Sequence, residues 1–229
     1  MNIAINTFLL VLAAIFPVVN PPGSALVFLG LTRGTAPDIL RALAQRVAIN
    51  SFIVLVCSFL LGAVILEFYG ISIPVLRVAG GLIIAVSGWK LLNEGSHKDI
   101  KPEDGGELRT NPFSLAFYPL TLPLTTGPGT IAVVISLGLS KASYKNSADE
   151  FIFVVAGLGA IAVIAVTIFL CFAYANRLRR LLGQGGTDIA VRLSAFILFC
   201  LGVQILWSGA SELLRSVIHT GSPAVAPVI

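Results

Sequence analysis

The sequence predicts an all-α integral membrane protein with six transmembrane helices, arranged as two inverted three-helix repeats, with helices 1 and 4 broken at the bilayer midplane. Three observations support this prediction: an apolar composition, six long apolar runs, and similar proline–glycine interruptions in the first and fourth runs. We expect one membrane domain over residues 1–229. Within it, the first repeat covers 1–92, a charged linker 93–112, the second repeat 113–219, and a tail 220–229.

The composition excludes the soluble and disordered classes. Of the 229 residues, 56% are hydrophobic and 11% are charged, whereas an average soluble domain carries about 25% charged residues. So few charged side chains cannot cover the surface of a soluble globule of this size, and disordered chains combine low hydrophobicity with high net charge. The formal net charge of +4 lies in the connections, where it indicates membrane topology rather than nucleic-acid binding.

Six runs are long and apolar enough to cross a bilayer, because a transmembrane helix needs about 20 mostly apolar residues. They are Ile3–Leu31, Val47–Leu66, Pro74–Leu92, Phe113–Leu139, Phe151–Ala175 and Ala190–Leu214. The stretch between the third and fourth runs is rich in charged residues and contains the pair Gly105-Gly106. It therefore reads as a solvated linker between two halves of three helices each.

Lysine and arginine indicate the orientation, because they concentrate in cytoplasmic loops. Ten of them lie in the first, third and fifth connections, and three lie on the opposite side. The ten are Arg33, Arg41, Arg46, Lys90, Lys98, Lys101, Arg109, Arg177, Arg179 and Arg180, and the three are Lys141, Lys145 and Arg215. We therefore expect a multi-pass protein of the cytoplasmic (inner) membrane with both termini on the non-cytoplasmic side.

The first and fourth runs share one interruption. An offset of 106 residues superposes Pro17 on Pro123, Pro22 on Pro128, Gly23 on Gly129 and Ser24 on Thr130. The third and sixth runs show a weaker echo, which aligns Arg77 with Arg192 and Gly88 with Gly202 only if one residue is slipped. Three helices per half place the halves in opposite orientations, which is the inverted repeat of many secondary transporters. Proline and glycine that merely kink transmembrane helices are the alternative reading.

A broken helix suits a small zwitterionic ligand. Proline ends regular helix because it has no amide hydrogen, and each half-helix that follows spans about half the hydrocarbon thickness. Helix N-termini bind anions, so we expect a carboxylate on the amides around residues 23–24 and 129–130 and an ammonium on the carbonyls around 18–19 and 124–125. The expected substrate-binding residues are Val19, Asn20, Pro22, Gly23, Ser24, Thr125, Thr126, Gly127, Gly129 and Thr130. For the side chains of Asn20, Thr125 and Thr126, capping of their own break is the alternative role.

Charged residues are missing from the middle of the six runs, and this favours a net-neutral substrate. Intramembrane acids are the usual proton carriers of pumps, and Glu67 and Glu212 lie only at run ends. The sequence contains no nucleotide-binding loop, hydrolase elbow or metal-ligand cluster. We therefore expect no enzymatic activity, no catalytic residue, no metal and no cofactor. A transporter of this kind would be coupled to a proton or to sodium, and no oligomeric state is predicted.

Several motifs of this chain resemble the MarC family of integral inner-membrane proteins. They are Asn20-Pro21-Pro22-Gly23 leading into Phe28-Leu29-Gly30-Leu31-Thr32, Gly70-Ile71-Ser72-Ile73-Pro74, Leu76-Arg77-Val78-Ala79-Gly80-Gly81, and Pro123 with Thr126-Gly127-Pro128-Gly129-Thr130. The family includes SnatA-type transporters of small neutral amino acids. The resemblance implies a six-helix domain in which the two broken helices frame the substrate.

The leading functional hypothesis is a secondary transporter of small neutral amino acids, such as glycine or alanine, that works by alternating access. A channel or export valve for small metabolites is one alternative. A membrane scaffold or accessory subunit, in which the breaks are only packing kinks, is another. Saturable flux with counterflow separates a carrier from a channel, and ligand-induced thermal stabilisation separates both from a scaffold.

Overall fold

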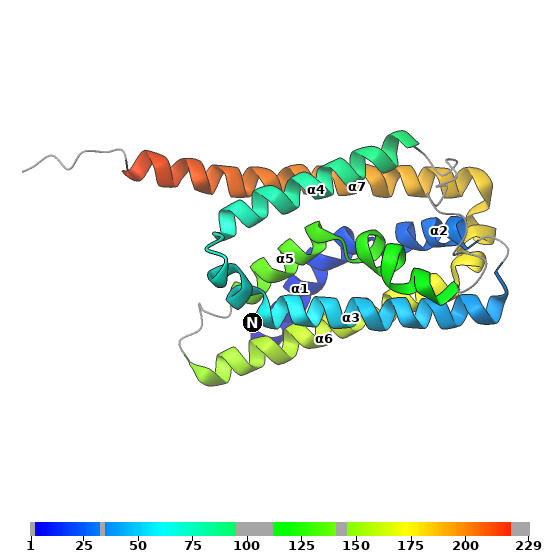
Figure 1. The fold of residues 1–229 in the computed structure, drawn as a ribbon, viewed down its shortest axis with the longest axis horizontal. Coiled ribbons are helices and arrows are strands. Elements are labelled where there is room, and N and C mark those ends of the chain that lie inside the picture. The colour runs from blue at the N-terminus through cyan, green and yellow to red at the C-terminus, as the bar shows by residue number, and fades with distance from the viewer. Residues whose placement is uncertain (1–2, 33–34, 95–111, 141–145, 221–229) are drawn as a thin grey trace, which may run out of the picture.

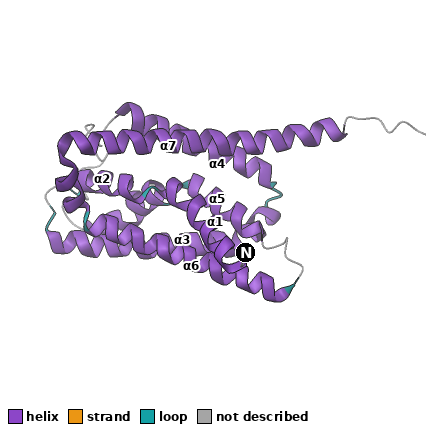
Figure 2. Ribbon diagram, turned by 180° about the vertical axis from the view of Figure 1, so that it is seen from behind, coloured by secondary structure: helices purple, strands orange, loops and turns teal. Residues whose placement is uncertain are grey.

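The computed structural model describes residues 3–32, 35–94, 112–140 and 146–220, and all regular elements in these ranges are helical (Figures 1 and 2). Seven of the elements are α-helices, one is a 3₁₀-helix (η2) and one is a π-helix (η3). In chain order they are α1 (Ile3–Val19), α2 (Pro21–Leu31), α3 (Pro37–Phe68), α4 (Ile73–Glu94), η2 (Pro112–Ala116), η3 (Phe117–Thr125), α5 (Pro128–Gly138), α6 (Ser147–Ala173) and α7 (Ala175–Thr220). The all-α prediction is confirmed.

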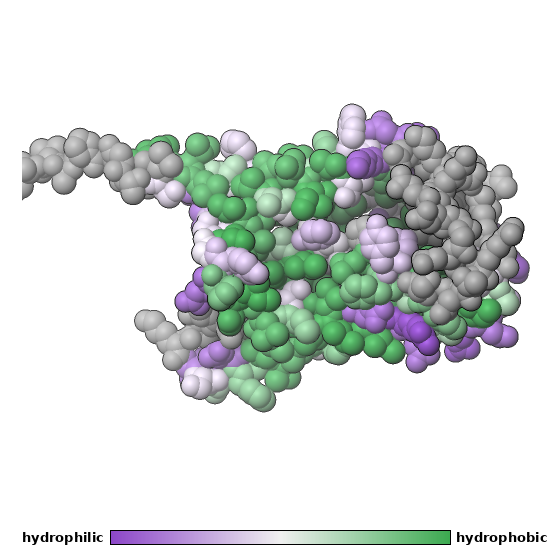
Figure 3. Space-filling view, viewed as in Figure 1, coloured by the Kyte–Doolittle hydropathy of each residue, from purple (hydrophilic) through white to green (hydrophobic). Residues whose placement is uncertain are grey.

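Five stretches of these helices are long and apolar enough to cross a membrane. They are Ile3–Leu29, which joins α1 and α2, and Pro37–Phe68, Ile73–Asn93, Ser147–Ala173 and Asp188–Ser216. Helix α5 is apolar but has only 11 residues. Apolar side chains cover most of the middle of the face in Figure 3, and hydrophilic residues gather toward its ends. Such an exposed apolar belt is what contact with lipid requires.

The fourth predicted run differs from the expected pair of α-helical halves. Its first part is the short helix η2 followed by the π-helix η3, and Tyr118 and Leu122 within η3 have extended backbone angles. Pro119 and Pro123 explain the irregularity, because each removes an amide donor from the helix ladder. Only the second part, α5, is a regular α-helix.

The helices form three layers, which both ribbon views show (Figures 1 and 2). Helices α4 and α7 form one outer layer, α3 and α6 form the other, and α1, α2, η3 and α5 lie between them. Each interrupted segment packs on a long helix of the opposite half: α1 and α2 contact α6, while η2, η3 and α5 contact α3. The two interruptions are therefore enclosed by the rest of the protein.

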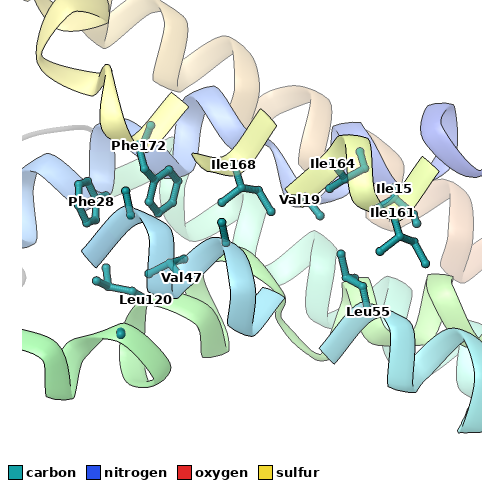
Figure 4. Close-up of a cluster of buried hydrophobic side chains, with 14 of the residues drawn as sticks. Ile15, Val19, Phe28, Val47, Leu55, Leu120, Ile161, Ile164, Ile168 and Phe172 are labelled. Atoms are coloured by element: carbon teal, nitrogen blue, oxygen red, sulfur yellow. The ribbon is translucent and has the colours of Figure 1, made fainter. Parts of the chain in front are cut away.

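A continuous apolar core joins the middle layer to α3 and α6 (Figure 4). Phe28 of α2 stacks on Phe172 of α6 with ring centroids 4.8 Å apart. One face of α6 is fully buried against this layer and includes Ile161, Ile164 and Ile168. Full burial of one such side chain contributes about 1.5–3 kcal/mol in water; in a bilayer, close packing between helices has to supply the stability instead.

Helices α4 and α7 are held together by glycines with a two-fold pattern. A Cβ added at Gly81 would lie 2.7 Å from the Gly202 carbonyl oxygen, and one added at Gly202 would lie 2.8 Å from the Gly81 carbonyl oxygen. The flanking contacts obey the same symmetry, since Gly88 approaches the backbone of Ala195 and Phe199, and Gly209 approaches that of Pro74 and Val78. Small residues of this kind let helix backbones come close together in membranes.

This pattern corrects the alignment of the third and sixth runs. Gly202 follows Gly81 by 121 residues, and Gly209 follows Gly88 by the same 121. The expected pairing of Gly88 with Gly202, which needed a one-residue slip, is therefore wrong. Sequence identity at isolated positions misled the alignment, whereas the packing contacts define one constant register.

The start of α3 and a bend in α7 were not predicted by the apolar runs. Helix α3 begins at Pro37, ten residues before the apolar run, because hydropathy marks the apolar part of a helix and not its end. Helix α7 turns sharply at Gly183, where φ is 66°. Most of the predicted linker (93–112) and nearly all of the predicted tail (220–229) lie outside the described residues.

Candidate functional site

The first break lies where the sequence predicts it, at Asn20 between α1 and α2. Asn20 has φ 46° and ψ 62°, a left-handed conformation that ends α1 and starts α2. Asparagine adopts this conformation more readily than most residues. The next two residues, Pro21 and Pro22, have no amide hydrogen, so they leave no donor unsatisfied in the first turn of α2.

The remaining polar groups of the first break bond to one another. Asn20 Oδ1 accepts the Gly23 N–H at 3.2 Å, and the Asn20 carbonyl accepts the Ser24 N–H at 2.9 Å. The Ser24 hydroxyl donates to the Val19 carbonyl at 3.1 Å. The expectation that the Gly23 and Ser24 amides are free is therefore wrong for this conformation. The left-handed turn folds the Asn20 side chain back over α2 and caps it.

The second break lies at Thr126 and Gly127, between η3 and α5. Thr126 has φ −117° and ψ 65°, and Gly127 is extended with φ −70° and ψ 171°. Among the described residues, no side chain caps the start of α5, and its first backbone bond runs from the Ile131 N–H to the Gly127 carbonyl at 3.1 Å. Since Pro128 has no N–H, the amides of Gly129 and Thr130 are the donors left over at this end.

Three buried threonines add side-chain hydrogen bonds to η3, and the Thr121 carbonyl also accepts the Thr126 backbone N–H at 2.8 Å. The hydroxyls of Thr121, Thr125 and Thr126 donate to carbonyls five residues earlier, at 2.6, 2.7 and 3.1 Å respectively. All three side chains are at most 1% exposed. Buried carbonyls in the membrane must find a donor, so these hydroxyls stabilise an irregular path that prolines impose. The structure thus gives the Thr125 and Thr126 hydroxyls a structural role as caps.

Helix α4 packs closely on the second break. A Cβ at Gly129 would collide with the Ile84 side chain and would lie 3.1 Å from the Gly80 carbonyl oxygen. The residue of α7 that corresponds to Gly80 in the 121-residue register is Leu201. In the first break, the atoms nearest to a Cβ added at Gly23 all belong to the Asn20 side chain. The two breaks are therefore alike in sequence and unequal in structure.

The structure brings the two breaks into one region of the middle layer, because α1 contacts α5 and α2 contacts η3. None of the elements α1, α2, η2, η3 and α5 contains Asp, Glu, Lys or Arg. Within the described ranges, no group of three or more His, Cys, Asp or Glu side chains could hold a metal ion. Seven of the predicted residues are buried and three are half-buried; the buried ones are Val19, Gly23, Ser24, Thr125, Thr126, Gly129 and Thr130, and the others are Asn20, Pro22 and Gly127.

Sequence reasoning missed two buried polar residues. Thr121 is fully buried and links both ends of η3, since it donates to Ala116 and accepts from Thr126. Ser51 of α3 is also fully buried, and its hydroxyl has no hydrogen-bond partner among the described residues. A serine spaced four residues from Val47 and Leu55, which lie on the buried face of α3, is the signal that could have identified it.

Comparison with known proteins assigns the chain to a family. The profile of the MarC family integral membrane proteins matches residues 5–214, which includes both breaks. The chain belongs to the MarC family. Its relatives include the inner membrane protein MarC of Salmonella typhimurium (strain LT2) and that of Escherichia coli (strain UTI89), each 31% identical over 209 residues. The aligned segment covers 90% of this chain and 94% of each relative.

The MarC relatives add a location to the architecture. Both are named inner membrane proteins, and this chain has five helices able to cross a membrane. The chain is therefore an integral membrane protein of the MarC family, and the inner membrane is its location by both observations. No solved structure matches it significantly.

Proposed function

We propose that this MarC-family protein is a secondary transporter of small neutral amino acids, such as glycine or alanine, that works by alternating access around its two helix breaks. One observation supports this most strongly. Two interrupted helices lie against each other inside the protein, and neither contains a charged residue. Broken helices at this depth are where secondary transporters bind substrate and coupling ion.

The proposed site suits a small ligand without net charge. Gly23, Gly80 and Gly129 surround the breaks, and a Cβ at any of them would meet a neighbouring atom closer than normal contact allows. The ligand therefore has little space. A net-charged ligand would need a counter-charge, because an unpaired charge is costly in a low-dielectric interior. An amino acid with a small apolar side chain meets both conditions.

We also propose the six-crossing inverted repeat, in which η2, η3 and α5 together form the fourth crossing. The α4–α7 contact with its constant 121-residue register supports a two-fold relation between the halves. The exchange of partners supports it too, since α1 and α2 pack on α6 while η3 and α5 pack on α3. In Figure 1, α1 begins and α7 ends toward the same end of the bundle.

Reconstitution into liposomes tests the transport proposal. We expect purified protein to take up labelled glycine or alanine, with saturation at high substrate and faster uptake when unlabelled amino acid is inside. Proton and sodium gradients, applied one at a time, identify the coupling ion. Absence of flux for a panel of neutral amino acids under every gradient would contradict the proposal.

The same vesicles separate the two alternatives. A channel or export valve would give flux without acceleration by internal substrate, because a channel needs no return step of an empty carrier. A scaffold would give no flux and no change in thermal unfolding when amino acids are added. A carrier should show both counterflow and stabilisation by its ligand, since a ligand that binds only the folded protein raises its apparent stability.

A further inference from the structure

The two breaks offer different groups to a ligand. The first turn of α2 has no spare amide, because Pro21 and Pro22 carry no N–H and Asn20 caps Gly23 at 3.2 Å. The Ser24 hydroxyl is also occupied, since it donates to the Val19 carbonyl. The first turn of α5 has no side-chain cap, so the Gly129 and Thr130 amides remain as donors.

Thr130 adds a second observation at the start of α5. Its side chain is 4% exposed, and no hydrogen bond joins its hydroxyl to any residue in the described ranges. Side chains on an α-helix lean toward its N-terminus, so the Thr130 side chain lies toward the same end as the two amides. The fully buried hydroxyls without a partner in the described residues are those of Ser51 and Ser136, so Thr130 Oγ1 keeps some accessible surface for a ligand, whereas its sequence counterpart Ser24 already donates to the Val19 carbonyl.

From this asymmetry we propose that the Gly129 amide, the Thr130 amide and the Thr130 hydroxyl form the subsite for the substrate's carboxylate, and that the self-capped first break contributes no anion-binding amide. The subsite rests on the proposed amino-acid transport. Three donors at a helix N-terminus suit one carboxylate, because the helix dipole and the unpaired amides both favour an anion there. No acidic residue of η3 or α5 competes for them.

The asymmetry has a cause in the packing. Gly80 lets α4 come within contact of Gly129, and this close approach holds the start of α5 in place without a capping side chain. Thr126 corresponds to Asn20 in the 106-residue offset. Its hydroxyl donates to the Thr121 carbonyl and does not cap α5. The Gly129 and Thr130 amides of the second break are therefore available to a ligand. The Gly23 and Ser24 amides of the first break are already bonded to Asn20.

Binding of labelled glycine to purified full-length protein tests the subsite with three variants. Thr130→Val removes only the hydroxyl, Thr130→Ser keeps it, and Ser58→Ala is the control outside both breaks, because Ser58 is a buried residue of α3 whose hydroxyl donates to the Val54 carbonyl. We expect Thr130→Val to weaken glycine binding about tenfold to a hundredfold, as loss of a hydrogen bond to a charged group does. Thr130→Ser and Ser58→Ala should bind nearly as well as the unmodified protein.

Competition for labelled glycine on the unmodified protein is an independent test of the subsite. Glycinamide, which lacks the carboxylate, should not displace glycine, and acetate, which lacks the ammonium, should displace it only weakly. Equal binding by Thr130→Val and Thr130→Ser, or an equal loss in Ser58→Ala, would overturn the subsite while leaving transport intact. Acetate that competes as well as glycine, or no binding of any amino acid, would instead overturn the proposed substrate. Thermal unfolding of each variant without ligand checks that its fold is retained.

Discussion

Asn20 is the only non-glycine residue with positive φ in the described part of the chain, and both its backbone and its side chain shape the first break. Its backbone ends α1, and its side chain caps α2 through Gly23. A β-branched or aliphatic residue could do neither, because the left-handed conformation is costly for such side chains and they have no acceptor. The residue thus explains how a double-proline break stays ordered inside an apolar core.

Asn20 and Gly23 should therefore be energetically coupled. A Cβ at Gly23 would collide with the Asn20 side chain, and 2.9 Å would separate it from Oδ1, so Gly23→Ala removes the same cap that Asn20→Ala removes. We expect the two substitutions to be non-additive by about 1 kcal/mol, the usual value of an N-cap. The measurement is a double-mutant cycle on the free energy of unfolding in mixed detergent micelles.

A cycle at Ser24 provides the comparison. Ser24→Ala removes a hydroxyl that bonds Val19 and not Asn20, so its coupling to Asn20→Ala should be smaller. Strict additivity of Gly23→Ala and Asn20→Ala would show that the cap does not exist in the membrane-like state.

At the scale of whole elements, the α4–α7 contact depends on glycines at the helix interface. We expect Gly202→Ala to lower the free energy of unfolding by about 1–3 kcal/mol, because the new methyl group overlaps backbone atoms of α4 that cannot move aside easily. An added Cβ there would lie 2.8 Å from the Gly81 carbonyl oxygen and 2.6 Å from Ala85 Cα. Chemical unfolding in micelles measures the change.

Gly159 of α6 is the matched control for this prediction. It also lies within a transmembrane helix, but a Cβ there would meet only Phe8, at 3.9 Å. Gly159→Ala should leave stability unchanged or raise it slightly, because alanine favours helix over glycine. Equal changes in the free energy of unfolding at positions 159 and 202 would mean that helix propensity, and not close packing, determines the effect of alanine.

The element that sequence patterns described least well is η3. Proline and threonine positions predicted an interruption, yet they did not predict a π-helix in which three carbonyls accept the hydroxyls of Thr121, Thr125 and Thr126. A hydroxyl can bond its own turn or a neighbouring helix with similar ease. The choice depends on which backbone path the packing around α3 permits.

At the scale of the whole molecule, the number of crossings decides the orientation of the termini. Six crossings place both ends on one side, whereas five place them on opposite sides. We expect alkaline phosphatase to be active, and green fluorescent protein to be dark, when each is fused in turn to the C-terminus and to the N-terminus. Insertion of the same reporters into the linker at 95–111 should give the reverse result, because Lys98, Lys101 and Arg109 lie in that segment and such residues concentrate in cytoplasmic loops.

Opposite reporter activities at the two termini would contradict the six-crossing proposal and make η2, η3 and α5 a re-entrant segment. The same end of the bundle holds the start of α1 and the end of α7 (Figure 1), which favours the even number. The experiment needs no knowledge of the substrate, so its result is independent of the transport assay.

The sequence by itself determined the membrane class, the apolar runs and the position of both breaks. These properties follow from composition, hydropathy and the missing amide of proline, all of which act locally. It also singled out Asn20 and Thr130 as expected substrate-binding residues, which stays a prediction. The tertiary structure alone decided that the breaks are unequal, because this depends on how closely a partner helix approaches. Gly80 brings α4 onto Gly129, whereas Asn20 turns back on Gly23. Two interruptions of one sequence pattern thereby become one capped turn and one open helix end.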